Sequence, residues 1–323
     1  MSQQAQLITQ LSVLKKQINQ GQIFQSLGTE IGKLVASVKK TRLTKVYLPR
    51  DDDEVLDLIK QLRQQHTDNN LTEISDQDLL LLLGHIGSPN PEVRDHGIYF
   101  LFNEFLEAQI FSKRQLTLAY KYLLSDEVLF DHILEPQNNA IYQRSFAVLL
   151  LSTLTYSDQA GYFFLTPELI NHAVNQLALY TIMETDTRGF IKKNGWGHAY
   201  THIGNMLDEL SQRDELSRAD KLFLMTVMIE RYKQLQTPLI FGEPQRIAAY
   251  LARLTNKNEL YRNYFLLQLK AWRSQLMNHF EPHTEGEWNQ LLNHTRLMQA
   301  ILVRGDFNQE IIKYIASGQQ YLG

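Results

Sequence analysis

The sequence predicts an all-α fold built from antiparallel helix pairs stacked side by side. Three observations support this prediction. Apolar residues recur at helical spacing along nearly the whole chain. Helix start signals follow one another at short intervals, which is typical of helices of about 12 to 20 residues joined by short turns. Segments that alternate apolar and polar residues with a period of two are absent, so we expect essentially no sheet.

Apolar stripes and charged first turns predict four helices in the N-terminal part. A first stripe ends at Gly21, and a second covers residues 23–38. The acidic residues 51–53 place negative charge at the first turn of a third helix, where the helix dipole favours it. Ser75, with an aspartate three residues later, resembles a capping box and predicts a helix over residues 79–86.

Proline-containing start signals predict the next helices. Asn90 and Pro91 supply an N-cap and a first-turn proline for a helix that runs to about Ala108. Ser112 and the Thr166-Pro167 pair repeat this device. Periodicity then predicts six later helices, over residues 198–210, 218–235, 245–254, 260–278, 285–303 and 307–316.

Length and composition are those of a folded protein. The 323 residues are 44% hydrophobic and 21% charged, which excludes general disorder. We expect one helical repeat-like domain over residues 1–323, with residues 1–45 as a candidate N-terminal helical extension. The net charge of −3 argues against a nucleic-acid partner, because phosphate contact normally requires a basic face.

Residue usage also predicts the compartment. The chain contains no cysteine, which fits a reducing interior and removes thiolate metal sites. Its N-terminus has neither the basic nor the apolar region of a signal peptide. The longest apolar runs are far shorter than the roughly 20 residues of a spanning helix. We therefore expect a cytoplasmic protein that does not contact a membrane.

The segment over residues 186–209 departs from the generic helical pattern. It carries an acid, an arginine, a tryptophan and two histidines at Asp186, Arg188, Trp196, His198 and His202. The four-residue spacing predicts that both imidazoles share one helix face. Two glycines flank Trp196 and leave N–H groups open at the start of that helix, which favours an anion.

Several short segments together resemble a known family. They are Leu48-Pro-Arg-Asp-Asp-Asp-Glu, Ile86-Gly-Ser with Val93-Arg-Asp, Gln143-Arg-Ser-Phe, and Asp186-x-Arg-Gly-Phe followed by Gly-Trp-x-His-Ala-x-x-His. In this order, over about residues 45–215, they resemble the uncharacterised bacterial DUF2785 family. The resemblance implies a right-handed α-α superhelix of the HEAT/armadillo solenoid kind, and it implies no established activity.

One departure from the family pattern affects the candidate site. The family usually has Ala-Asp where this chain has Gly204-Asn205, and an asparagine cannot supply a charge. The stretch that begins at Ser88 with Ser-Pro-Asn-Pro-Glu-Val-Arg-Asp-His also resembles the start of a HEAT repeat. The candidate ligand-binding residues are Asp186, Arg188, Trp196, His198, His202, Asn205, Arg94 and Arg144.

These residues leave two kinds of function open. The leading hypothesis is a non-catalytic binding protein that holds a peptide, a protein or a small polar ligand on a concave face near residues 186–205. The alternative is a metal- or His/Asp-dependent enzyme at the same site, for example a hydrolase. His198 and His202 are the candidate ligands of a divalent metal, but no third ligand is identified, and the cofactor stays unknown. In the structural interpretation, these histidines and arginines hold the loops together.

Overall fold

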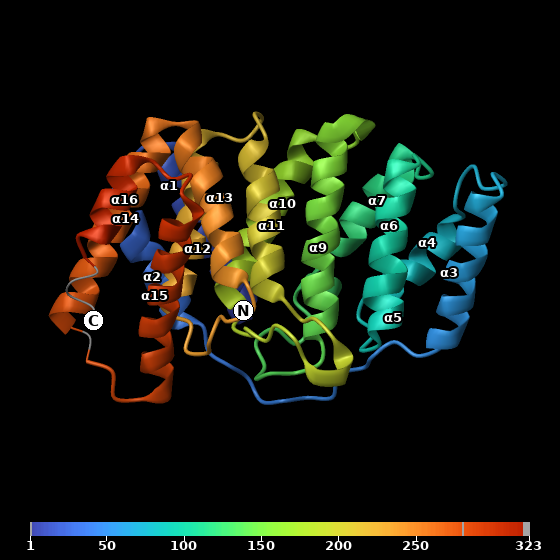
Figure 1. Cartoon of the computed structure of the whole chain (residues 1–323), viewed down its shortest axis with the longest axis horizontal. Helices are drawn as coiled ribbons and strands as arrows, with labels where there is room; N and C mark the ends of the chain where they lie inside the picture. Colours follow the sequence, from blue (N-terminus) through green and yellow to red (C-terminus); the bar gives the residue numbers. More distant parts are fainter. Residues whose placement is uncertain (1, 280, 319–323) are drawn as a thin grey trace. The chain divides into compact units, whose positions relative to one another are not determined.

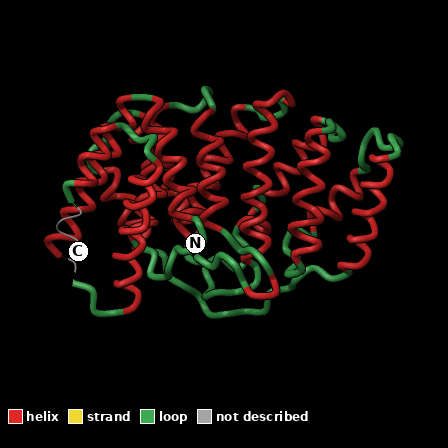
Figure 2. Tube along the Cα trace, viewed as in Figure 1, coloured by secondary structure: helices red, strands yellow, loops and turns green. Residues whose placement is uncertain are grey.

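The computed structural model describes residues 2–279 and 281–318 and confirms the all-α prediction. In this part of the chain, helices are joined by turns and loops (Figures 1 and 2). Extended pairing within these residues is limited to one isolated antiparallel bridge between Phe190 and Trp196. None of the helices in the described ranges is long and apolar enough to cross a membrane.

The chain divides into two compact units whose segments alternate along the sequence. Unit 1 comprises Met1–Lys39, Val174–Thr187 and Leu207–Gly323, and unit 2 comprises Lys40–Ala173 and Arg188–Met206. The chain passes between the units within α10 (Pro167–Met183) and again within α11 (Ala199–Gln212). The single domain predicted over residues 1–323 stays a prediction.

Unit 2 is a series of helices that pack on elements close to them in the chain. Its helices are α3 (Asp52–Thr67), α4 (Asp76–Gly84), α5 (Pro91–Val93), α6 (Phe100–Glu107), α7 (Lys113–Leu123), α8 (Asp126–Leu129) and α9 (Ile141–Ser157). Helix α3 packs on α4, α4 on α7, and both α7 and α8 on α9. This local packing explains why short polar turns suffice as connections.

Unit 1 combines the N-terminal and C-terminal helices. Its helices are α1 (Gln3–Asn19), α2 (Leu27–Ser37), α12 (Arg218–Lys233), α13 (Glu243–Lys257), α14 (Glu259–His279), α15 (Glu285–Arg304) and α16 (Gln309–Ala316). Both α1 and α2 pack on α12, and α13 packs on α14 and α15. Most of the candidate extension over residues 1–45 is therefore part of the body of this unit.

Several helices begin where the local sequence predicted. The side chains of Ser75 and Ser112 each accept a hydrogen bond from the backbone N–H three residues later, and Ser112 forms a complete capping box. Asn90 caps α5, with proline at its first position. Thr166 accepts from the N–H of Leu169 at 3.3 Å. A cap needs only neighbours in the chain, so the sequence identifies it directly.

Two of the helical stretches that differ from the prediction have a clear physical reason. The helix expected from residue 90 to 108 consists of α5, a π-helical segment Arg94–Tyr99, and α6. Gly97 lies in the π-helical segment, and a Cβ there would be 2.7 Å from the carbonyl oxygen of Glu92. Helix α9 was not predicted as an element. It is buried on nearly every face, so it has no polar stripe from which periodicity identifies a surface helix.

Candidate functional site

The structure places the candidate residues in two groups. Asp186 belongs to unit 1, and the other seven candidates belong to unit 2. Asp186 is buried, and its backbone N–H donates to the carboxylate of Glu184 at 2.8 Å. The clamp or ion pair between Asp186 and Arg188 stays a prediction.

Residues 188–198 form a closed turn, which we call the hairpin loop. The N–H of Ile191 donates to the carbonyl of Gly195 at 2.7 Å, and the N–H of Gly197 donates to Gly189 at 2.8 Å. The N–H of His198 donates to the carbonyl of Arg188 at 3.0 Å. Two N–H groups that we expected to be open to an anion are therefore engaged within the loop.

Arg94 fastens the hairpin loop to the core of unit 2. Its side chain is fully buried, and its guanidinium carbon lies 4.5 Å and 4.7 Å from the ring centres of Tyr142 and Phe146. Nη2 donates to the carbonyls of Asn194 at 2.8 Å and Trp196 at 3.2 Å. Burial lowers the pKa of Arg94 to about 10, and the Asp95 carboxylate opposes that shift, so the guanidinium stays charged at neutral pH.

Arg144 and Arg188 both bind the loop that precedes α9. Arg144 is buried on α9, and its Nη1 donates to the carbonyl of Asp131 at 2.7 Å and to the side-chain oxygen of Asn138 at 3.3 Å. Arg188 Nη2 donates to the backbone carbonyl of Asn138. Both arginines thus donate to backbone carbonyls of this loop, as side chains that hold loops in place do.

The two histidines differ in backbone conformation. His198 has a φ of 51° and directly precedes α11, whereas His202 lies within that helix. The expected helix over residues 198–210 therefore begins one residue later. The His198 ring stacks on Trp196 with centroids 4.0 Å apart, and it lies perpendicular to the His202 ring at 6.1 Å. The left-handed turn at His198 thus removes it from the helical geometry on which the shared-face argument depended.

His202 is bound into the core of unit 2. The side chain is 5% exposed, and its Nδ1 lies 2.8 Å from the carbonyl oxygen of Ser145. A carbonyl can only accept, so Nδ1 carries the proton. Burial lowers the pKa of His202 to about 3, with a smaller contribution from His198, so the imidazole is neutral at physiological pH.

Metal ligation would need more donors than this region brings together. Across the described ranges, no three side chains of the types histidine, cysteine, aspartate and glutamate are grouped in a way that could hold a metal ion. His198 and His202 therefore remain a two-residue set here. Asn205, half-buried on α11, offers a neutral amide where the family has a carboxylate.

The outer side of the hairpin loop is aromatic and cationic. Phe190 is 50% exposed and packs edge-on against Trp196 at 5.0 Å, while Trp196 and His198 are half-buried. Lys192 and Lys193 are exposed at the tip. Phe190 was not among the candidates predicted from the sequence. The sequence signal that could have identified Phe190 as a site residue is its position opposite Trp196, since the two aromatic residues flank a Lys-Lys-Asn-Gly turn.

A basic cluster on α13 in unit 1 was not among the residues predicted from the sequence. Arg246, Arg253 and Lys257 follow one another at spacings of seven and four residues. Such spacings place side chains on one helix face. This spacing could be seen in the sequence. The pairing could not, because Asp208, the acid that pairs with Arg246 and Arg253, lies on α11.

Comparison with known proteins identifies the family. The family model described as protein of unknown function (DUF2785) matches residues 129–303. The match contains the Gln143-Arg-Ser-Phe segment and the histidine segment, whereas the Leu48 and Ile86 segments lie outside it. Neither the curated proteins nor the solved structures gave a match. The matched range covers more than half of the sequence, and the chain therefore belongs to the DUF2785 family.

Proposed function

We propose that this protein is a non-catalytic α-helical binding protein that presents its hairpin loop to a negatively charged peptide segment of a partner. The observation that carries the proposal is the contact between exposed Phe190 and half-buried Trp196, beside two exposed lysines, on a loop held by the buried Arg94. A fixed loop loses little conformational entropy on binding, so its contacts contribute more fully to affinity.

The residues of this region divide into a supporting set and a contacting set. Arg94 is buried and bonds to backbone carbonyls of the hairpin loop. Arg144 and His202 are also buried and bond to the carbonyls of Asp131 and Ser145, which supports the structure around the loop. Phe190 and Trp196 reach the surface and contact one another. Aromatic side chains supply large contact areas and are enriched at binding hot spots.

Charge favours an acidic partner. Residues 188–206 contain Arg188, Lys192 and Lys193 and no acidic residue, although the whole chain is net negative. A local positive region on an otherwise acidic protein steers oppositely charged segments toward it. Phe190 and Trp196 would then receive an apolar side chain of the same peptide.

The enzymatic alternative receives less support from the geometry. A general base operates best when its pKa lies near the working pH. The pKa of His202 is about 3, and the ring nitrogen Nδ1 is bound to Ser145. His202 is therefore poorly suited to accept a proton from a substrate near pH 7.

The proposal includes the arrangement expected for the family. We propose that the helix pairs stack in the HEAT/armadillo manner and that the protein acts in the cytoplasm. The packing of chain neighbours within unit 2 supports stacked pairs. The cysteine-free sequence supports a reducing compartment.

A peptide-binding measurement tests the proposed function. Fluorescein-labelled peptides that combine glutamates with one Leu or Phe are titrated with the full chain and read by anisotropy. Peptides with lysine in place of glutamate serve as the charge control. We expect saturable binding of the acidic peptides only, and a loss of roughly tenfold or more in affinity in the Lys192→Glu/Lys193→Glu variant.

Matched variants separate this site from general charge effects. Lys113→Glu changes an exposed lysine elsewhere in unit 2 and should leave binding within about twofold of wild type. Phe190→Ala should weaken binding without changing its salt dependence. Equal binding of acidic and lysine peptides, or equal losses in the hairpin and Lys113 variants, would contradict the proposal.

A further inference from the structure

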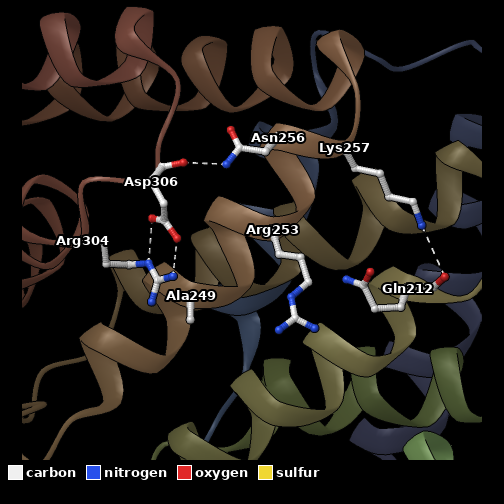
Figure 3. Close-up of a pocket in the computed structure, with 7 residues that line it drawn as sticks. All are labelled: Gln212, Ala249, Arg253, Asn256, Lys257, Arg304 and Asp306. Carbon is white, nitrogen blue, oxygen red and sulfur yellow. Dashed lines mark hydrogen bonds and ion pairs between the residues drawn. The ribbon is translucent and has the colours of Figure 1, made fainter. Parts of the chain in front are cut away.

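Unit 1 contains a pocket that the proposed function does not use. It has a volume of about 490 Å³ and lies at the C-terminal half of α13 (Figure 3). Residues from three elements line it: Gln212 from α11, Arg253, Asn256 and Lys257 from α13, and Arg304 and Asp306 at the end of α15. Its volume lies in the range of small-molecule sites, which is about 300 to 1,000 Å³.

The positive charge of Arg253 is only partly neutralised by its surroundings. The buried Asp208 carboxylate pairs with Arg246 at 2.8 Å and with Nε of Arg253 at 3.2 Å. Glu209 also faces both guanidinium groups, but burial first and the Asp208 carboxylate second raise its pKa, which disfavours its charged form. Among the described residues, the two Nη groups of Arg253 make no hydrogen bond, and its side chain is 53% exposed. The free edge of this guanidinium presents donors that suit an oxyanion.

Lys257 adds a second incompletely neutralised charge. Its Nζ lies 3.3 Å from the carbonyl oxygen of Gln212 and 3.5 Å from the carboxylate of Asp214, whose side chain is 96% exposed. Such long contacts with an exposed carboxylate contribute little. Lys221 lies close by, and its pKa falls to about 8 because of burial first and the positive charge of Lys257 second. The carboxylates of Asp214 and Glu215 oppose this shift without cancelling it, so two cations are held near one another with incomplete neutralisation.

The opposite wall of the pocket is already neutral. Arg304 binds the carboxylate of Asp306 through two nitrogens, and the Asn256 side chain donates to the backbone carbonyl of Asp306 at 2.6 Å. Figure 3 shows these contacts on one side and the side chains of Arg253 and Gln212 turned toward each other on the other side. The unsatisfied charge of the pocket is thus concentrated at Arg253 and Lys257.

We propose that this pocket binds the phosphate group of a small phosphorylated molecule, with Arg253 and Lys257 as its charged donors. A phosphate monoester carries up to two negative charges and three terminal oxygens, so it can use the Arg253 edge, the Lys257 ammonium and the Gln212 amide together. A carboxylate has two oxygens and one charge and would use fewer of these donors. The pocket is larger than a phosphate group, which leaves room for the rest of the molecule.

Isothermal titration calorimetry of the full chain tests this site. The probes are inorganic pyrophosphate and glucose 6-phosphate, with glucuronate, a sugar that carries one carboxylate, as the carboxylate control. We expect saturable binding of the two phosphate probes at about 1 mM or below. Arg253→Gln and Lys257→Gln should each weaken it roughly tenfold, as expected for the loss of hydrogen bonds to a charged group. Lys270→Gln, which removes an exposed positive charge on α14, should leave binding unchanged.

The two pocket variants differ in their expected effect on stability. A loss of phosphate affinity in both variants can therefore be separated from a loss of folded protein in one of them. Arg253→Gln removes one partner of buried Asp208 and can lower the melting temperature. Lys257→Gln removes a charge that repels Lys221, so its melting temperature should hold or rise while its phosphate affinity falls.

Three results would overturn the proposal: no saturable binding of either phosphate probe, equal weakening in Lys270→Gln, or glucuronate binding as tight as glucose 6-phosphate. Binding of acidic peptides by the hairpin loop should persist in both pocket variants. Failure of one proposal is therefore distinguishable from failure of the other.

Discussion

Arg94 donates a hydrogen bond from Nη2 to the backbone carbonyl of Asn194, 100 residues further along the chain, at 2.8 Å. Through this contact, the π-helical segment that follows α5 supports the hairpin loop. The same nitrogen also reaches the carbonyl of Trp196 at 3.2 Å. One buried guanidinium thus holds two backbone groups on the loop that carries the proposed binding surface.

Replacing Arg94 tests this support. In Arg94→Lys the charge remains, but an ammonium cannot reproduce the fork that reaches the carbonyls and packs on Tyr142. We expect the free energy of unfolding to fall by about 1–3 kcal/mol, the usual loss for buried polar groups left unpaired. Urea unfolding followed by circular dichroism measures it. Arg63→Lys, in a partly exposed pair with Glu104, is the control and should change stability by less than about 1 kcal/mol.

The low pKa of His202 predicts a dependence of stability on pH. The folded state holds this imidazole neutral down to about pH 3, whereas the unfolded chain protonates it near pH 6.5. The unfolded state therefore binds more protons between these values, and the stability contributed by this group is present above pH 6.5 and is lost as the pH falls toward 3. The slope for one group is at most about 1.4 kcal/mol per pH unit.

The measurement compares wild type with His202→Gln, because other groups titrate in the same range. Burial raises the pKa of Glu230 and Glu243, and these groups act in the opposite direction. Burial lowers the pKa of His294 to about 4, so it acts in the same direction as His202. Subtracting the two urea-unfolding profiles isolates His202. An identical slope in both proteins between pH 6.5 and 4 would show that this histidine is not held neutral.

Gly195 should be sensitive to a single added methyl group. Its φ is 71°, and a Cβ there would lie 3.2 Å from the Pro91 side chain and 3.4 Å from Arg94 Nη2. Gly305 has a nearly equal φ of 75°, and a Cβ there would meet nothing within 4 Å. Gly305, with a ψ of −3°, is in the left-handed helical region, so its alanine variant should lose about 1–2 kcal/mol. Gly195, with a ψ of −146°, lies in a region essentially restricted to glycine, and its alanine variant should lose about 1–3 kcal/mol from the backbone alone. Gly195→Ala should lose more, because the added methyl also crowds the hairpin loop. Equal losses in urea unfolding would contradict this account.

The buried ion pair of Glu230 and Lys233 in unit 1 supplies another prediction. The two side chains are each 7% exposed, and their charged atoms are 2.5 Å apart. Lys233→Met leaves the Glu230 carboxylate buried without its cation, which should cost about 3–5 kcal/mol. Acidification should recover part of that loss, since the pKa of Glu230 is already raised by burial. Lys33→Met, in an exposed pair with Glu30, should change the melting temperature little.

The sequence by itself determined the helices whose signals are local. Ser75, Asn90 and Ser112 cap helices as predicted because a cap bonds only to neighbours two or three residues away. The family could also be recognised from the sequence, because its motifs are defined by the identity and order of their residues. Recognising them does not require knowledge of their contacts. Helix α9 was missed because burial on nearly every face removes the alternation that marks a surface helix.

Only the tertiary structure decided the contacts and burial of the candidate residues. Spacing predicted a shared face for His198 and His202, but the turn that closes the hairpin loop gives His198 a left-handed backbone. Arg94 meets Asn194, and Arg253 meets Asp208, across long separations in the chain. Whether a charged side chain supports a loop or faces a pocket depends on these distant partners. Burial and pairing arise from packing, and a linear pattern of residue types does not contain them.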